Sequence, residues 1–535
     1  MIPLAVAICA TFFLFNACMS DSKTETAAID SLDLKRGSVI ACGPQDGESF
    51  GTVSFTASVP DNLKRDFNMG IALLYSFEYD ESEKLFAKII DQAPECAMAY
   101  WGVAMSNFHQ LWTPPTPAEL KKGTQAIKIA RSISKKTKRE SDYIEAIGQF
   151  YDNADQLDHR SRVLKFEKAM ESIYASYPDD PEATVFYSLA LNAAADPADK
   201  TYSKQRKAFD LLSAVFKKQP LHPGVAHYII HNCDNPELAE LALPAARKYA
   251  AIAPASSHAQ HMPSHIFTRL GLWDECIQSN LVAVSSAQCY AEQAKLKGHW
   301  DEELHALDYL MYSYLQKGDY VHADQQLDYL QKINDVSPVN FKVAYAFAAI
   351  PARYTLERKM WKEAAALQIY PAFVAWEKFP WQKGIFHFAK LLGYVHINKS
   401  DSAQKELETL RSLYEVLSKE KNKALEAAQV AVQIKAGEGW IQYKHGNNDK
   451  AIELMTSAAD MEDATEKHPV TPCAVIPARE LLGELLMEMN KPELAREAFE
   501  LDLKIHPHRL NGLQGLAKAS QRAGNKSQGD LLSRK

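Results

Sequence analysis

The chain has 535 residues, of which 47% are hydrophobic and 24% are charged, an ordinary composition for a globular protein. Its formal net charge of −7 argues against a non-specific nucleic-acid-binding protein, which needs a basic face. The sequence holds no P-loop motif and no GxGxxG motif after a strand pattern, so nucleotide binding has no support. We therefore expect no nucleic-acid partner.

The first 17 residues are nearly all apolar and end in Phe15-Asn16-Ala17, directly before Cys18. This pattern resembles the signal peptide of bacterial lipoproteins, which is cleaved before a cysteine that is then acylated. The run is shorter than the roughly 20 residues of a membrane-spanning helix, which favours a signal peptide. It departs from the usual signal peptide in one respect, because no Lys or Arg precedes the apolar stretch. We expect residues 1–18 to be a lipoprotein signal with its lipidation site at Cys18. An uncleaved N-terminal anchor is the alternative, and either reading places the body outside the cytoplasm, in the periplasm or at the outer membrane.

Residues 19–60 are predicted to form a polar tether and an extended lead-in. Residues 52–56 (TVSFT) alternate as a short strand would, and an extended segment is the alternative. Export makes disulfides possible, and Cys42 and Cys96, which flank the first helical repeat, are the first candidates for a pair. No CxxC motif is present, so neither a zinc ribbon nor a thioredoxin-type site is supported.

From residue 61 to the end, the pattern is helical and follows the tetratricopeptide (TPR) repeat. The register is clearest over residues 189–290, where small residues recur every 34 positions at Ala208, Ala242 and Cys276. We expect Cys276 to be a buried thiol. Thr116, Pro117 and Glu119 form a capping-box sequence that begins a new helix. Residues 61–535 are therefore predicted to be an all-α, TPR-like α-solenoid, a superhelix of stacked antiparallel helix pairs.

Histidines recur at matching places in consecutive repeats. With the small residue set as position 20, the histidines of three units fall at position 2, 5 or 9, and these positions face the concave groove in TPR repeats. Steps of three and four residues give one stripe on a helix, and stacked repeats bring such stripes side by side. The predicted metal-ligating residues are His227, His231, His258, His261, His265, His305 and Asp308.

These spacings suit a metal ion held by helices. Imidazole nitrogen is a good ligand for transition metals, and we expect one bound ion, with zinc as the first choice and copper or iron as alternatives. His227, His231, His261 and His265 are the expected ligands, flanked by the others. Two further interpretations stay open: a metal-free polar groove, and histidines that only pack. Pro263 predicts either a kink inside a helix or a helix that begins there, with His258 and His261 in the preceding loop.

Other candidate ligand-binding residues lie outside the stripe. Arg353 falls on a groove position and can clamp a carboxylate or phosphate, or form a structural ion pair. Tyr312 is a second candidate in the groove. His109 and Trp112 are candidates for an aromatic patch, whereas Trp101 is expected in the core because it precedes Gly102 in a packing slot.

Four strings make a resemblance specific: CAMAYWG at 96–102, HYIIH at 227–231, HAQHMPSHIF at 258–267 and IPAR at 350–353. They resemble a widespread family of uncharacterised bacterial TPR-repeat proteins, from residue 61 to the end. The resemblance implies a fold and brings no established reaction.

Together these patterns predict an exported TPR-repeat binding protein. Its concave groove is expected to hold a peptide, protein or small-molecule ligand at a histidine-rich metal site. The alternatives are a metal-dependent enzyme, a hydrolase or an oxidoreductase, that uses the same histidines, and a metal-free peptide-binding scaffold. Whether the protein is an enzyme stays open at this point.

Overall fold

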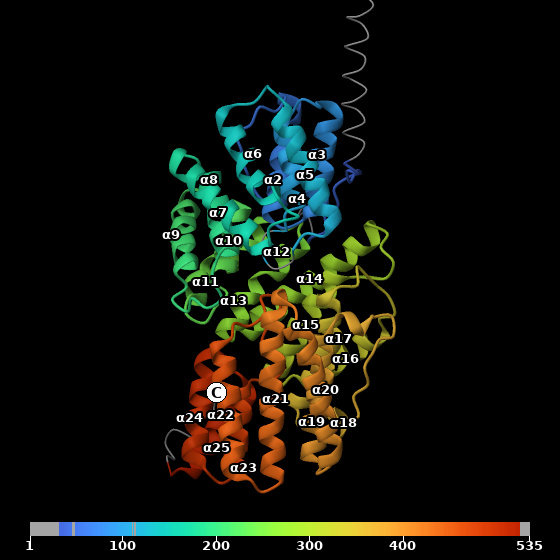
Figure 1. Cartoon of the computed structure of the whole chain (residues 1–535), viewed down its shortest axis with the longest axis vertical. Helices are drawn as coiled ribbons and strands as arrows, with labels where there is room; N and C mark the ends of the chain where they lie inside the picture. The colour runs from blue at the N-terminus through green and yellow to red at the C-terminus, as the bar shows by residue number, and fades with distance from the viewer. Residues whose placement is uncertain (1–31, 45–48, 110, 112–113, 525–535) are drawn as a thin grey trace, which may run out of the picture. The chain divides into compact units, whose positions relative to one another are not determined.

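A computed structural model describes residues 32–44, 49–109, 111 and 114–524. The chain, shown in Figure 1, divides into two compact units. The first unit contains the described residues up to 39 together with 50–196 and 202–225, and the second contains 40–49, 197–201 and 226 onward. Cys18 and Trp112 lie outside the described residues.

The first unit is a run of helices that pack against their neighbours in sequence. They are η1 (Asp61–Leu63), α2 (Lys64–Tyr75), α3 (Tyr79–Gln92), α4 (Ala97–Ser106), α5 (Pro117–Ser132), α6 (Lys138–Tyr151), α7 (His159–Ser176), α8 (Pro181–Ala193) and α9 (Ser203–Lys218).

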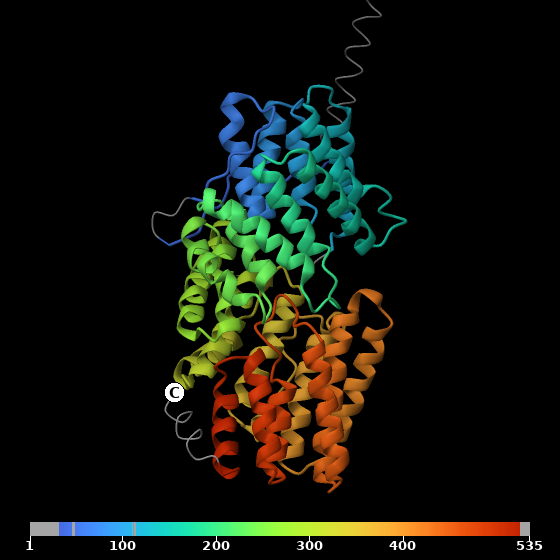
Figure 2. The same ribbon diagram turned by 90° about the vertical axis from the view of Figure 1, so that its left-hand side faces the viewer.

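The second unit begins inside α10 (Pro223–Cys233). Its first part contains α11 (Ala239–Ile252), α12 (Ser257–His261), α13 (Pro263–Leu270), α14 (Trp273–Gln293), α15 (Asp301–Lys317), α16 (Tyr320–Lys332), α17 (Phe341–Glu357) and α18 (Trp361–Ala365). Its second part contains η2 (Trp376–Lys378), α19 (Pro380–His396), α20 (Ser400–Ser418), η3 (Lys421–Lys423), α21 (Ala424–Lys444), α22 (Asn448–Ala464), α23 (Ala478–Glu488), α24 (Pro492–Ile505) and α25 (Leu510–Arg522). Figure 2 shows the later helices of this unit side by side.

The described residues contain almost no sheet. Two short strands, β1 (His299–Trp300) and β2 (Val336–Ser337), pair in parallel through His299 and Val336. The prediction of an all-α, TPR-like solenoid is confirmed. None of the described helices combines the length and the apolar character needed to cross a membrane.

Small residues stand where neighbouring helices cross. Ala208, Ala242 and Cys276 are fully buried in α9, α11 and α14, as their 34-residue spacing predicts. The first repeat shows the cause: a Cβ atom added at Gly102 would lie 2.5 Å from the ring of Phe86. Close packing therefore explains why the spacing of small residues carries the repeat.

The local signals in the first unit behave as expected. Thr116 caps α5 in a reciprocal capping box with Glu119, and Pro117 begins the helix. Residues 52–56 form no strand and have no regular secondary structure. Phe55 in this segment is buried and contacts Trp101, which is itself in the core as predicted.

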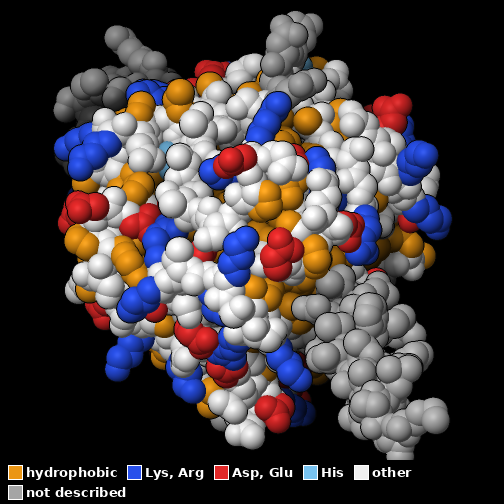
Figure 3. Space-filling model, turned by 90° about the horizontal axis from the view of Figure 1, so that it is seen from above, with side chains coloured by type: hydrophobic (Ala, Val, Ile, Leu, Met, Phe, Trp, Pro, Cys, Tyr) orange, Lys and Arg blue, Asp and Glu red, His pale blue; other side chains and the backbone are white. Residues whose placement is uncertain are grey.

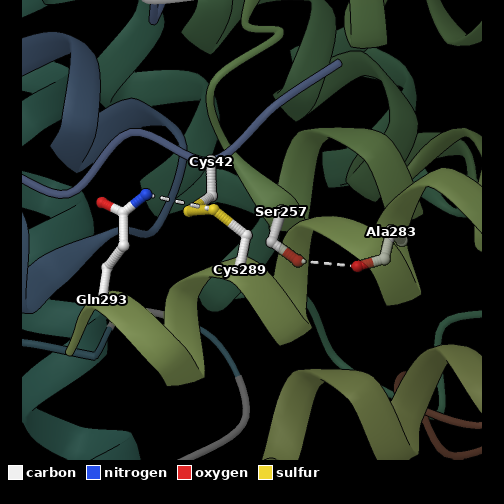
Figure 4. Close-up of a disulfide and its surroundings, with 5 residues drawn as sticks. All are labelled: Cys42, Ser257, Ala283, Cys289 and Gln293. Atoms are coloured by element: carbon white, nitrogen blue, oxygen red, sulfur yellow. Dashed lines mark hydrogen bonds between the residues drawn. A yellow bond between two sulfur atoms is a disulfide. The ribbon is translucent and has the colours of Figure 1, made fainter. Parts of the chain in front are cut away.

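The disulfide joins Cys42 to Cys289, so the predicted Cys42–Cys96 pair is wrong. Cys42 lies beside the turn before α12, where its backbone N–H donates to the carbonyl of Ala255 at 3.1 Å. Cys289 comes from α14, as Figure 4 shows, and the Gln293 amide donates to its sulfur at 3.2 Å. Cys96 is a buried free thiol. The error arises because residues 40–49 belong to the second unit, whereas Cys96 belongs to the first.

The surface viewed in Figure 3 carries a mixture of side-chain types. Basic, acidic and hydrophobic groups are interspersed over its described residues, in keeping with a chain of mixed charge whose formal total is −7.

Candidate metal centre

Four helices of the second unit carry the predicted histidines: α10, α12, α13 and α15. The structure brings six of them together in two groups of three, and within each group one ligand atom from every residue lies within 4.8 Å of the others. The first group is His227, His231 and His258, and the second is His261, His265 and His305.

The first group converges through Nε2 atoms. The Nε2 atom of His227 lies 2.9 Å from that of His231 and 3.2 Å from that of His258. Tetrahedral zinc with Zn–N bonds of 2.0–2.1 Å would hold its ligand nitrogens about 3.3 Å apart. The ring of His227 is positioned by Tyr249, which stacks on it with centroids 5.0 Å apart. The spacing of these nitrogens is therefore close to that of a coordination sphere.

The second group repeats this arrangement. The Nε2 atoms of His261 and His265 face one another at 3.2 Å, and the ring centroid of His305 lies 4.1 Å from that of His261. All three residues are buried. Tyr309 lies beside them, with its hydroxyl 3.3 and 3.4 Å from the two nitrogens of His265.

Hydrogen bonds at Nδ1 fix the tautomers of two rings. His261 Nδ1 lies 2.6 Å from Asn280 Oδ1, and the Asn280 amide N–H donates to the carbonyl of Cys276 at 2.8 Å, which sets the direction of the amide. His265 Nδ1 lies 3.0 Å from Asp234 Oδ2, which can only accept when ionised. In a neutral ring, Nδ1 therefore carries the proton and Nε2 carries a lone pair.

Burial keeps these rings neutral. Loss of water lowers the pKa of His231, His261 and His305 well below the ordinary value, and neighbouring imidazoles lower it further. Burial also lowers the pKa of His265, against the opposing effect of Asp234. Neutral imidazole is the form that binds a metal ion.

Asp234 is the anchor of the second group. Arg269 donates to its Oδ1 at 2.9 Å and Lys467 donates to its Oδ2 at 2.8 Å. Burial alone would raise the pKa of Asp234, but Lys467 and Arg269 outweigh it and hold the pKa far below the ordinary range. An ionised carboxylate on the far nitrogen of a histidine is the usual support for a ligand imidazole.

The helix is interrupted between His261 and His265 of the second group. Helix α12 ends at His261 and α13 begins at Pro263, whose missing N–H is harmless at a first helical position. Met262 between them keeps helical backbone angles. The interpretation of a helix that begins at Pro263 is thus confirmed, although His258 and His261 lie in a short helix rather than a loop.

Four of the six histidines are buried and His231 and His258 are partly buried, whereas the repeat register predicts that all six line an open groove. The loop at residues 465–477 lies across this part of the second unit: Lys467 reaches Asp234, and the Cys473 carbonyl accepts from Arg353 at 2.7 Å. A contact between residues 233 positions apart leaves no trace in the repeat pattern. The grouping also differs, because the four expected ligands divide between two groups.

Asp308, Arg353 and Tyr312 form a separate buried network. Arg353 donates to Asp308 Oδ1 at 3.1 Å, and both side chains are almost wholly buried. The Arg353 guanidinium lies 5.1 Å over the ring of Tyr312. Asp308 therefore lies outside both histidine groups. Arg353 forms a structural ion pair, which was the alternative to a ligand clamp.

His109 lies in the first unit and belongs to neither histidine group. Its Nε2 atom is 3.1 Å from Glu119, and its ring centroid is 5.0 Å from that of Tyr79. The companion position Trp112 falls outside the described residues.

Sequence reasoning missed the supporting residues of the centre: Asp234, Asn280, Tyr309, Tyr249 and Glu302. Asp234 follows directly on the helix that bears His227 and His231, and Tyr309 lies one turn after His305. The closeness of Asp234 and Tyr309 to predicted histidines in the sequence is a weak indication that they belong to the site. The role of Asn280 depends on how α14 packs, and no local sequence pattern indicates it.

Comparison with known proteins adds little beyond the fold. No family model matches the chain, and no curated protein matches it. Two solved structures, "Human IFIT1 dimer with PPP-AAAA" and "Human IFIT1 dimer with m7Gppp-AAAA", are each 13% identical, with TM-scores of 0.38 and 0.39, over 89% of this chain and 94% of theirs. "Structure of Naa15/Naa10 bound to HypK-THB" is 10% identical with a TM-score of 0.24, over 88% of this chain and 63% of that one. This likeness concerns the fold alone, and the resemblance to bacterial TPR-repeat proteins stays a prediction.

Proposed function

We propose that this protein is an exported helical-repeat protein that binds a transition-metal ion through its buried histidines. One observation carries the proposal: His261 and His265 direct their Nε2 atoms at one another at 3.2 Å while Asn280 and Asp234 hold their Nδ1 protons.

In neutral rings, this arrangement leaves two lone pairs facing one another. Among the described residues, His265 Nε2 is the only hydrogen-bonding neighbour of His261 Nε2. The Tyr309 hydroxyl can donate to His265, but the lone pair of His261 then still lacks a donor. Burying an acceptor without a partner costs roughly 1–3 kcal/mol. A metal ion between the two nitrogens replaces this cost with two coordinate bonds.

The donor set indicates the class of ion. Six imidazoles suit zinc, copper, iron or nickel, and we place zinc first with copper and iron as alternatives. Two carboxylates lie beside the rings but outside the ligand set: Asp234 at His265, and Glu302, whose Oε2 atom lies 4.0 Å from His258 Nδ1. Burial would raise the pKa of Glu302, but Lys342 and His258 hold it well below the ordinary value.

The burial of the histidines supports a metal-binding protein best. His227, His261 and His265 are 0–3% exposed, so an extended peptide in a groove would not contact them. This argues against the metal-free peptide scaffold. The enzyme reading is the second candidate, because three histidines leave a coordination position open and the Tyr309 hydroxyl lies beside His265.

Export is the second part of the proposal. The Cys42–Cys289 disulfide supports it, because disulfides persist in oxidising compartments and are rare in the cytosol. We assign anchoring in the periplasm or at the outer membrane to a lipid on Cys18. Intact-mass analysis of membrane-extracted protein should show loss of residues 1–17 and an acylated N-terminus. A protein that retains Met1 would overturn this part.

Metal analysis of protein purified without an affinity tag tests the first part. We expect zinc, copper or iron in the isolated protein, and a chelator should lower its thermal unfolding temperature. His261→Gln should lose metal, whereas His322→Gln, at an exposed histidine paired with Asp319, should keep it. A protein that takes up none of these ions when they are supplied would defeat the proposal.

A further inference from the structure

The two histidine groups are built to one plan. In each, a pair of histidines four residues apart comes from one repeat: His227 and His231, then His261 and His265. The second pair stands 34 residues after the first, which is one TPR period. The helix at the start of the next repeat supplies the third imidazole.

We propose that the centre is dinuclear, with one imidazole-preferring divalent ion, zinc or copper, at each three-histidine group. This inference rests on the proposed function and goes further, because it sets the number and the position of the ions. A single ion held by four histidines, the arrangement that the repeat register suggests, would take two ligands from each group and would not use His258 or His305.

The groups are neighbours. His258 belongs to the first and His261 to the second, yet both lie on the five-residue helix α12. The ring centroids of His231 and His265 lie 6.4 Å apart across the junction between the groups. Because a metal ion lies about 2.0–2.1 Å from its ligand nitrogen, ions bound on either side of this junction are adjacent.

Each group is complete by itself. In the first group, the Nε2 atom of His227 lies 2.9 Å from that of His231 and 3.2 Å from that of His258. In the second group, the two facing Nε2 atoms lie 3.2 Å apart. Each group also has a carboxylate beside one of its rings: Asp234 accepts from His265 Nδ1 at 3.0 Å, and Glu302 lies 4.0 Å from His258 Nδ1. A four-histidine site would need neither this duplication nor two separate acids.

The ligand sets favour zinc or copper for the pair. Both groups consist of imidazoles alone, and the two acids lie behind the rings. Paired iron or manganese sites in helical proteins take carboxylates directly as ligands. Neutral nitrogen donors suit zinc and copper, and loading the protein with each ion in turn distinguishes them.

Stoichiometry tests the proposal on full-length, tag-free protein stripped of metal and dialysed against Zn²⁺ or Cu²⁺. We expect two ions per chain in the wild type, one in His227→Gln, one in His261→Gln and none in the double variant. His322→Gln is the matched control and should keep two. One ion per chain in the wild type overturns the dinuclear centre and leaves the proposed function standing, whereas no ion defeats both.

The copper arm tests adjacency without any variant. Two Cu²⁺ ions at neighbouring groups interact through their magnetic dipoles, so the wild type should show a broadened electron paramagnetic resonance spectrum with a half-field signal. The single variants, which hold one copper ion, should show a sharper spectrum without the half-field signal. A wild-type spectrum that matches two isolated copper ions would overturn the placement of the ions at these two neighbouring groups.

Discussion

His261 and His265 face one another at 3.2 Å through Nε2, one helical turn apart and across the break at Met262. The far nitrogen of His261 is held by Asn280 at 2.6 Å, so the orientation of this ring depends on α14.

Asn280→Ala should therefore weaken metal binding without removing a ligand. Loss of a residue that orients a ligand imidazole lowers metal affinity about 10–100-fold. Competition with a chromophoric chelator measures the change, and Asn447→Ala, at an exposed asparagine, is the control. An unchanged affinity in Asn280→Ala would show that the tautomer of His261 is not set by this contact.

The sequence could predict the histidines of the centre but not their grouping. A 34-residue spacing places His227 and His261 at one repeat position, and that position alone suggests a shared site. Their division into two groups depends on the third imidazole of each, from His258 and His305, and on the break before Pro263. These are features of packing, and the period does not encode them.

The pairing of Cys42 with Cys289 gives a second prediction. Closing a loop with a sequence separation of 247 should stabilise the protein by about 2–5 kcal/mol, so Cys289→Ser should unfold at lower denaturant concentration. Non-reducing peptide mapping should link these two cysteines. In the unreduced, unfolded protein, alkylation should label Cys96, as it should Cys233 and Cys276. A Cys42–Cys96 peptide would contradict the structure.

Arg353 is predicted to stabilise the protein rather than bind a ligand. Arg353→Ala leaves Asp308 buried without its cation and should cost about 3–5 kcal/mol. The double variant Arg353→Met with Asp308→Leu should recover most of that loss, because the uncompensated charge is gone. Chemical denaturation measures both.

The matched control for this pair is Arg358→Ala. Arg358 pairs with the exposed Asp324, and such surface pairs contribute about 0–1 kcal/mol. If Arg353→Ala were as mild as Arg358→Ala, the Arg353–Asp308 pair would not be a determinant of stability.

Local and periodic features of the fold could be predicted, whereas contacts between distant segments could not. The capping box at Thr116 and the small residues at Ala208 and Ala242 act within one or two helices, so their signals lie within a few dozen residues. The loop that carries Lys467 reaches Asp234 from 233 residues away. Its contacts bury the centre, and nothing in the repeat register indicates which loop will do so.

The last prediction concerns Glu462 and the dependence of stability on pH. Burial raises the pKa of Glu462 to about 8, against the backbone N–H of Ala478, which donates to its Oε2 at 2.6 Å. The folded pKa thus lies above the unfolded value of 4.5, and the folded state binds more protons between these two values. Stability from this group is complete below about pH 4.5 and is lost as pH rises through about 8. Glu462→Gln stays neutral, so it should flatten the fall in unfolding free energy between pH 5 and 8 by up to roughly 3–4 kcal/mol. Glu453→Gln, at an exposed glutamate paired with Lys450, should leave the profile unchanged. Denaturation series across this pH range measure all three proteins, and parallel profiles for the wild type and Glu462→Gln would show that Glu462 titrates outside this window.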